Sequence, residues 1–317
     1  MTLPAPQPET ERASAFAYTP FDGGPYRLAM GLLALKPEAW IEIDRHYDSY
    51  LAEKQRLLAE RSTEVFAALP EAAAASRELR DRLAAHLTRI FPERFRQEGR
   101  VLTNLARNRR FDLDGKLHPL DLAGRLVQED LCLMQAGPEG YRLTAASLCF
   151  PTRWRLRDKL GHPMGRIHGP VPFYGEKLER PVDRFFERMK ADKPVWRLNW
   201  SLTDDPALFQ PTGHSRPDVD LGITAENVGA RVFFRVERQT LCRLPISGAI
   251  CFGIRIHQNP LSDVEREPGL AARLAAALRQ LPEEVLSYKS VTVFHAPLLS
   301  YLDRVAAGDW RSPCGKT

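Results

Sequence analysis

Two long segments of alternating side chains constrain the fold of this 317-residue chain most strongly. Residues 232–244 read V-F-F-R-V-E-R-Q-T-L-C-R-L and residues 249–257 read A-I-C-F-G-I-R-I-H. Aromatic and β-branched residues that alternate with polar ones favour strands, and the intervening P-I-S-G favours a tight turn. The pair therefore predicts a hairpin, so the fold must contain an antiparallel sheet.

The order of the expected elements extends this sheet. Residues 131–134 and 141–150 predict a second hairpin around the turn at 138–140, and residues 195–202 alternate as a further strand. A helical connector that includes residues 151–172 lies between the second and third strands. The sequence thus predicts an α+β fold with a five-stranded antiparallel sheet.

Amphipathic segments flank this region on both sides. Helices are expected at 38–61, 62–69, 71–90 and 180–190, and in the C-terminal part at 269–281 and 297–306. The expected organisation is a disordered tail over 1–20, an N-terminal helical region over 21–95, a sheet domain over 96–262 and a C-terminal helical extension over 263–317.

The connector holds one histidine on a stiff backbone. His168 precedes Gly169 and lies between Pro163 and Pro170, where prolines restrict the chain. A neutral, oriented and partly shielded imidazole is suited to bind a metal ion. The alternative is an ordinary half-buried histidine bonded to backbone, which a single histidine on its own favours.

Composition and charge exclude several classes of function. The net charge is +5 with 40 acidic residues interspersed, which does not indicate a nucleic-acid partner. None of the five cysteines forms a C-x-x-C pair, so a zinc ribbon is excluded and an iron–sulfur cluster in this chain is not expected. No signal peptide or membrane-spanning segment is visible, so we expect a cytoplasmic protein without a membrane partner.

Four blocks of sequence resemble a known enzyme family. They are P-F-D-G-G-P-Y-R-L-A-M-G-L from residue 20; Q-E-D-L from 128; F-P-T-R-W, K-L-G and I-H-G-P-V-P between 150 and 172; and R-L-N-W with V-E-R-Q-T-L-C-R-L-P-I-S-G-A-I. Together they are similar to the α subunit of the haem-dependent oxidative N-demethylases, whose haem domain has a PAS scaffold. The predicted order of strands and connector matches that scaffold, and haem-binding PAS domains take their axial histidine from the connector.

The resemblance implies haem b in this chain, with His168 as its iron ligand. Propionates require cations, and the candidates are Arg153, Arg166, Arg238 and Arg243. The candidates for the apolar slot are Leu198, Trp200, Phe233, Val236, Phe252 and Ile254.

The resemblance also implies a small secondary amine, such as dimethylamine, as substrate and O2 as oxidant. A secondary amine is a cation at neutral pH, so Glu237 is the candidate partner, with Asn199 and Tyr174 as further polar candidates. With period two, Glu237 and Gln239 share one face of their strand and Arg238 lies on the other. A solvated sheet face is the alternative for this polar strand.

The family divides its chemistry among subunits. Partner reductase and folate-binding subunits are implied, which carry FMN, an iron–sulfur cluster and tetrahydrofolate. Two other functions stay open: a haem-binding PAS-type sensor or carrier without turnover, and a haem-free binding module.

Overall fold

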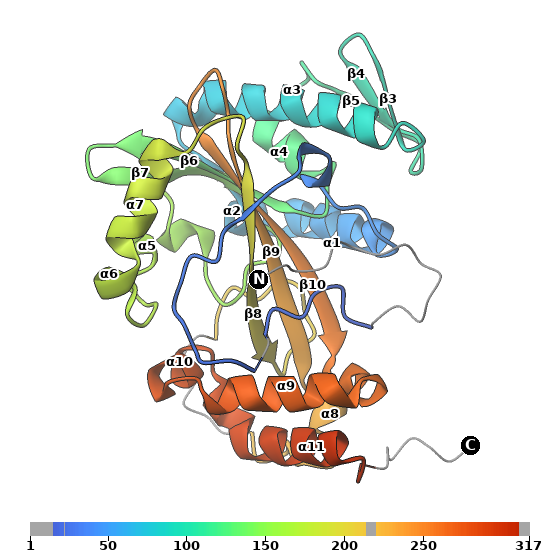
Figure 1. Ribbon diagram of the computed structural model, residues 1–317. Helices are drawn as coiled ribbons and strands as arrows, with labels where there is room; N and C mark the ends of the chain where they lie inside the picture. The colour runs from blue at the N-terminus through green and yellow to red at the C-terminus, as the bar shows by residue number, and fades with distance from the viewer. Residues whose placement is uncertain (1–14, 22, 214–219, 311–317) are drawn as a thin grey trace.

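The computed structural model describes residues 15–21, 23–213 and 220–310. An antiparallel sheet with the strand order β1-β8-β9-β10-β6-β7-β2 crosses the molecule (Figure 1). Its strands are β1 (Leu33–Ala34), β2 (Phe66–Ala68), β6 (Asp130–Gly137), β7 (Gly140–Ser147), β8 (Val195–Thr203), β9 (Phe233–Arg243) and β10 (Ile250–Pro260). A small separate sheet contains β3 (Phe95–Glu98), β4 (Val101–Asn104) and β5 (Arg109–Asp112).

The five long strands of the main sheet are those that the sequence predicts. The sheet has seven strands rather than five because two short segments pair with its edges: β1 adds to β8 and β2 adds to β7. The edges of a sheet carry unpaired backbone groups, and short added strands satisfy some of them.

Helices surround the sheet. The longer ones are α1 (Tyr47–Glu60), α3 (Ala73–Ile90), α7 (Glu179–Arg188), α9 (Pro268–Arg279) and α11 (His295–Ala307). Short ones are α2 (Ser62–Val65), α4 (Pro119–Gly124), α5 (Met164–Ile167), α6 (Tyr174–Lys177), α8 (Val228–Arg231) and α10 (Glu283–Tyr288). Figure 1 shows α9 and α11 at one end of the sheet, α3 at the other, and α5 to α7 beside β7.

The register assigns the side chains of the central strands to two faces. Asn199 of β8, Glu237 of β9 and Ile256 of β10 lie opposite one another, so they share a face. We call this face the connector face. Its apolar side chains, such as Ile254 and Ile256, form a cluster against which the connector residue Ile167 packs. The other face divides into two apolar clusters, one around α3 and one around α9 and α11.

Ionic groups fill the middle of that second face. Arg238, 3% exposed, forms an ion pair with Glu42 through Nε at 3.1 Å, and Glu42 also bonds His257 Nε2 at 2.9 Å. Arg255 reaches Asp44 at 2.7 Å. These carboxylates come from residues 41–46, which are not helical, so the helix expected at 38–61 begins only at Tyr47. Tertiary ion pairs override the local helical periodicity here.

Two other expectations differ from the structure. The helix predicted at 62–69 ends at Val65, and the chain then continues as strand β2. A tail is expected over residues 1–20, and residues 1–14 of it lie outside the described residues. Phe16, in contrast, is 5% exposed and packs edge-on against Phe234.

Within the described residues, none of the helices has the length and apolarity needed to cross a bilayer. Cys132, Cys149 and Cys251 are buried and Cys242 is half-buried, and all four are free thiols. Burial raises the pKa of each of these thiols, so they remain protonated and pack as small apolar side chains.

Candidate functional site

The connector brings His168 over the connector face of the sheet. His168 follows the last residue of α5, and its backbone N–H bonds the carbonyl of Met164. The ring nitrogen Nδ1 lies 3.0 Å from the same carbonyl oxygen. A carbonyl only accepts, so Nδ1 carries the hydrogen and the lone pair of the neutral ring is on Nε2. No hydrogen bond occupies Nε2 within the described part of the chain.

The surroundings of His168 keep the ring neutral and oriented. The imidazole stacks on the Tyr174 ring, with the two centroids 4.6 Å apart and the planes 16° from parallel. Burial, together with the nearby charge of Lys159, lowers the pKa of His168 to about 4. A stacked partner restricts rotation but leaves the in-plane nitrogens free. The Tyr174 hydroxyl is buried and, among the described residues, has no hydrogen-bond partner.

A carboxylate lies on the connector face opposite the connector. Asn199 pairs with Glu237 across β8 and β9, and Arg197 pairs with Gln239. Oε2 of Glu237 accepts hydrogen bonds from Asn199 Nδ2 at 3.2 Å and from Gln239 Nε2 at 2.7 Å. Glu237 is 8% exposed, and no described lysine, arginine or histidine forms an ion pair with it. The carboxylate is therefore held by two neutral amides and forms no direct ion pair within the described residues.

The charge of Glu237 acts on four nearby cations. One of them, Arg235, is fully buried and donates to Thr152, to Gln258 and to the carbonyls of Phe150 and Leu208. The other three are half-buried. Burial lowers the pKa of Lys159 and of Lys289 to about 8, and it lowers the pKa of Arg197, while the charge of Glu237 acts in the opposite direction on all three. The buried Nε of Arg197 has no hydrogen-bond partner among the described residues. Lys289 Nζ donates to the carbonyl of Trp200 at 2.6 Å, and Lys159 Nζ lies 4.4 Å from the centre of the Trp154 ring. One carboxylate does not balance these half-buried cations, so the site favours an anionic ligand.

The arginines expected to bind propionates are dispersed. Arg238 is on the opposite face, where it bonds Glu42 and the carbonyls of Ala39 and Trp40. Arg243 is near the far end of β9, where it donates to Tyr141 Oη at 2.8 Å and to the carbonyls of Gly248 and Phe186.

Arg153 and Arg166 differ in exposure. Arg166 is exposed on α5. Arg153 is 7% exposed, and its guanidinium donates to the carbonyl of Lys289. Of the four arginines, Arg153 lies nearest to the cation group, because its charge contributes to the lowered pKa of Lys289.

The apolar residues expected to form one slot also divide. Phe252 and Ile254 belong to the cluster of the connector face, together with Met164 and Val171 of the connector region. Leu198, Trp200 and Val236 belong to the cluster on the other face, around α9 and α11. Their place in the alternating strands explains this, because even-numbered positions of β8 and β9 point away from Glu237.

Sequence reasoning missed the three cations of the site, Lys159, Arg197 and Lys289. Arg197 precedes Asn199 by two positions in an alternating strand, so the shared face was a usable signal. Gln239 likewise follows Glu237 by two positions, and the alternating pattern places both on one face of the strand. Lys289 gives no such signal, because a short connection after α10 brings it in from the end of the chain.

A metal ion held by side chains alone has no support in the described residues, where no three His, Cys, Asp or Glu side chains converge. A haem iron requires only one strong protein ligand, an apolar slot and cations for the propionates. The free Nε2 of His168, the apolar connector residues and the half-buried cations supply the kinds of side chain that such a site needs.

Comparison with known protein families agrees with this chemistry. The family model described as "Haem-dependent oxidative N-demethylase, alpha subunit-like" matches residues 31–299. The match includes the whole main sheet, the connector with His168, and the strands that carry Asn199 and Glu237. The chain therefore belongs to the haem-dependent oxidative N-demethylase, alpha subunit-like family.

Proposed function

We propose that this chain binds haem b through His168 and oxidatively N-demethylates a small secondary amine. The observation that carries the proposal is the state of His168: Nδ1 is bonded to backbone, the pKa is about 4, and Nε2 is open. An ordinary core histidine has both nitrogens satisfied or enclosed, whereas a haem ligand needs one fixed and one free. The antiparallel pairing of the five long strands, with the connector after the second, supports a PAS-like scaffold.

The cations beside Glu237 are the proposed partners of the propionates. Lys159, Arg197 and Lys289 supply up to three positive charges, and two propionates would leave the site near neutrality. Arg153 is a further candidate through its position beside Lys289. With the cations engaged in this way, the carboxylate of Glu237 stays available for a cationic substrate.

Glu237 is the proposed anchor for the amine. Asn199 and Gln239 fix one carboxylate oxygen, so the group is oriented before the substrate arrives. A dialkylammonium ion has two N–H donors and two small alkyl groups, which matches a carboxylate in apolar surroundings. Haem, when bound, supplies the oxidising chemistry at its iron.

The overall reaction balances with O2 and two electrons. One methyl C–H bond of the amine is oxidised to C–OH, the second oxygen atom leaves as water, and two protons are consumed. The C–N bond of the hydroxymethylamine then breaks to give a primary amine and formaldehyde. The alpha-subunit description of the family supports partner subunits, and we propose that these carry the FMN, iron–sulfur and folate functions that the sequence resemblance implies.

The proposal predicts an amine-sensitive haem spectrum that depends on Glu237. Haem-loaded protein is titrated with dimethylamine and, as an uncharged control, with dimethyl ether. Only the amine should produce a saturable Soret change. Glu237→Gln should weaken amine binding about tenfold or more, because a hydrogen bond to a charged group is lost, while haem content is retained.

Glu176→Gln, the same change at an exposed site on α6, is the matched control and should bind the amine like the wild type. An absorption spectrum that responds to no small amine would contradict the enzymatic proposal. It would favour haem binding for sensing or transport without turnover.

A further inference from the structure

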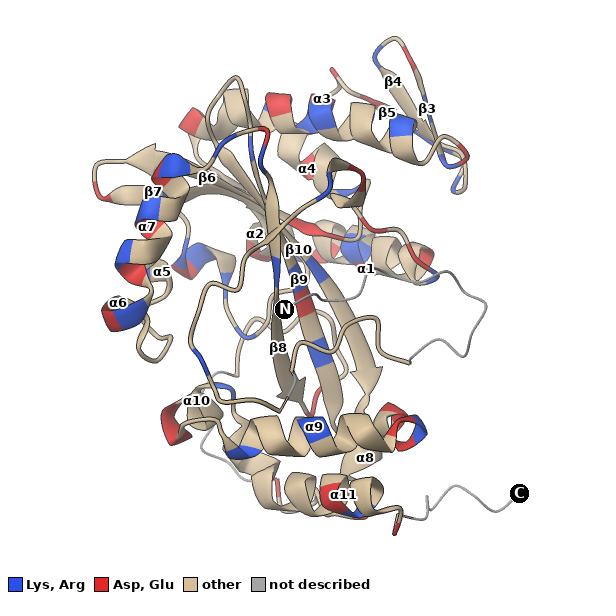
Figure 2. Cartoon of the chain, in the orientation of Figure 1, with Lys and Arg blue, Asp and Glu red and all other residues tan. Residues whose placement is uncertain are grey.

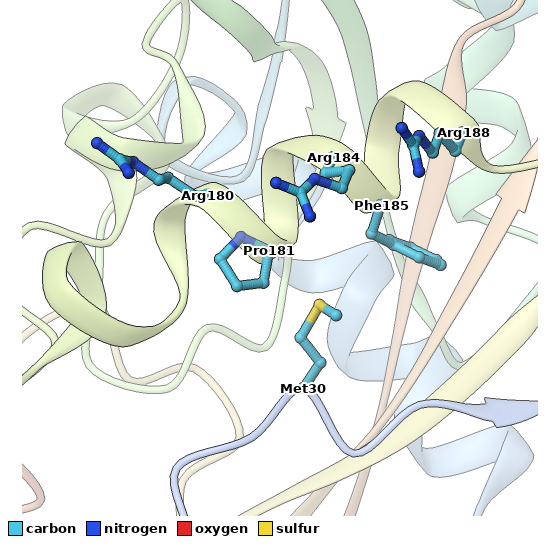
Figure 3. Close-up of a pocket in the computed structure, with 6 residues that line it drawn as sticks. All are labelled: Met30, Arg180, Pro181, Arg184, Phe185 and Arg188. Atoms are coloured by element: carbon cyan, nitrogen blue, oxygen red, sulfur yellow. The ribbon is translucent and has the colours of Figure 1, made fainter.

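Helix α7 carries a row of arginines that the proposed chemistry does not use. Arg180, Arg184 and Arg188 follow one another at intervals of four residues, so they lie along one side of the helix. All three are exposed, and Figure 3 shows them in sequence along α7. A rise of about 1.5 Å per residue separates successive members by roughly 6 Å along the axis.

The carboxylates of the same helix lie near this row without bonding it. Glu179, Asp183 and Glu187 each precede an arginine by one position, about 100° away around the helix axis, and Asp183 and Glu187 follow Arg180 and Arg184 by three positions. Partial burial, followed by the charges of Glu179 and Glu187, raises the pKa of Asp183. That shift reflects a separate acidic row, and Figure 2 shows both signs of charge alternating along α7. None of the three arginines forms an ion pair with a described carboxylate.

An apolar floor lies beside the arginines. Met30, Pro181 and Phe185 line a surface hollow of about 540 Å³ together with the three arginines. In Figure 3, Pro181 and Phe185 project from α7 toward Met30, which comes from the N-terminal segment. An apolar centre with a charged rim is the usual anatomy of a protein–protein contact.

This surface and the connector pack against the same apolar cluster. Phe185 and Met30 pack against the same apolar cluster as Met164 and Ile167, the first and last residues of α5. Helix α7 also contacts α5 directly. A protein bound at the arginine row would therefore lie close to the segment that holds His168.

We propose that the α7 arginine row is the docking surface for an acidic electron-carrier protein. The inference rests on the proposed function, which requires electrons from another protein. Three exposed guanidinium groups that form no ion pair with a described carboxylate can bond acidic groups on a partner surface, and the apolar floor gives the contact its centre. Electron-transfer contacts between proteins are usually small and transient. In each encounter the carrier is oxidised by one electron and a ferric haem iron is reduced to ferrous.

The test uses a plant-type [2Fe–2S] ferredoxin as an acidic carrier. Its binding to the full chain is measured by calorimetry at low and high salt, with or without haem. The variant with Arg180→Glu, Arg184→Glu and Arg188→Glu should bind at least about tenfold more weakly than the wild type. The remaining binding should depend less on salt, because an electrostatic contact has been removed.

A matched variant controls for net charge. Arg89→Glu, Arg96→Glu and Arg110→Glu change three exposed arginines on α3, β3 and β5 by the same total charge. This variant should keep most of the affinity, as should the triple Arg→Lys variant of α7. Equal losses in the two Glu variants, or no ferredoxin binding by the wild type at low salt, would overturn the proposal.

Haem reduction gives a second readout. With reduced ferredoxin as donor, the α7 Glu variant should be reduced at least about tenfold more slowly than the control variant. Dithionite, a small reductant that needs no protein docking surface, should reduce both at the same rate. A protein that takes up no haem would contradict the proposed function, whereas the binding measurement tests the docking surface separately.

Discussion

At the scale of single residues, two histidines show what separates a core histidine from a candidate ligand. His86 on α3 is 5% exposed and packs edge-on against Trp40, and its Nε2 is buried without a partner among the described residues. His168 instead has a bonded Nδ1 and an open Nε2. Both rings are neutral at pH 7, because burial lowers each pKa to about 4. The two histidines therefore differ in the accessibility of the unbonded Nε2, which is buried in His86, and not in the protonation state of the ring.

His86 gives a pH prediction for the free energy of unfolding. Its pKa is about 4 in the folded protein and 6.5 in the unfolded chain. The unfolded state therefore binds more protons between these values, and stability falls as pH decreases from 6.5 to about 4. The loss from this residue should reach roughly 2–3 kcal/mol.

Urea denaturation of the wild type and of His86→Leu, at pH 7 and at pH 4.5, measures the contribution. The variant should lose less stability than the wild type over this interval. Equal losses in the two proteins would show that His86 does not titrate with a lowered pKa.

At the scale of elements, residues 41–46 connect the two apolar clusters on the second face of the sheet. Glu42 accepts from His257 and Arg238 and from the Tyr18 hydroxyl. Burial alone would raise the pKa of Glu42, but these partners outweigh burial and lower it. Glu42→Gln should cost about 3 kcal/mol of unfolding free energy, because it leaves the charge of Arg238 buried and unpaired.

Denaturant unfolding at pH 7 checks this cost. Glu38→Gln is the control, since Glu38 is exposed on the neighbouring 3₁₀ turn Pro37–Ala39 and should change stability by less than about 0.5 kcal/mol. A Glu42→Gln protein as stable as this control would show that the ion pairs contribute nothing to the fold.

The strands were more predictable from sequence than the segments between them. β9 and β10 alternate over their whole length, so their pairing and the separation of Glu237 from Arg238 could be predicted. The segment 41–46 has helical periodicity, and only distant partners such as Arg238 decide its non-helical form. Local pattern contains no information about partners that are nearly two hundred residues away.

The candidate site was predictable to the same limited extent. The proline- and glycine-rich sequence around His168 indicated a stiff connector, and period two placed Asn199 and Glu237 on definable faces. The cations required three-dimensional information, because Lys159, Arg197 and Lys289 come from a connector, a strand and the C-terminal region. The affinity of guanidinium groups for carboxylates favoured arginines such as Arg238, which the fold uses elsewhere.

At the scale of the whole molecule, the sheet separates stability from chemistry. The second face contains two apolar clusters and the ionic groups between them. The connector face combines an apolar cluster with His168, Glu237 and the three cations. The helices α5 to α7 lie beside β7 at the edge of this face (Figure 1). The arginine row of α7 is exposed to solvent there. The cofactor, substrate and partner that we propose would thus all bind on the same side of the molecule.

A haem titration with imidazole rescue tests the central claim most directly. Wild-type apoprotein should take up haem with a sharp Soret band, and His168→Gly should lose that band or bind haem far more weakly. Added imidazole should restore the spectrum of the glycine variant, and His162→Gly, the control from the same connector, should behave like the wild type. An unchanged Soret band and haem affinity in His168→Gly would contradict the account.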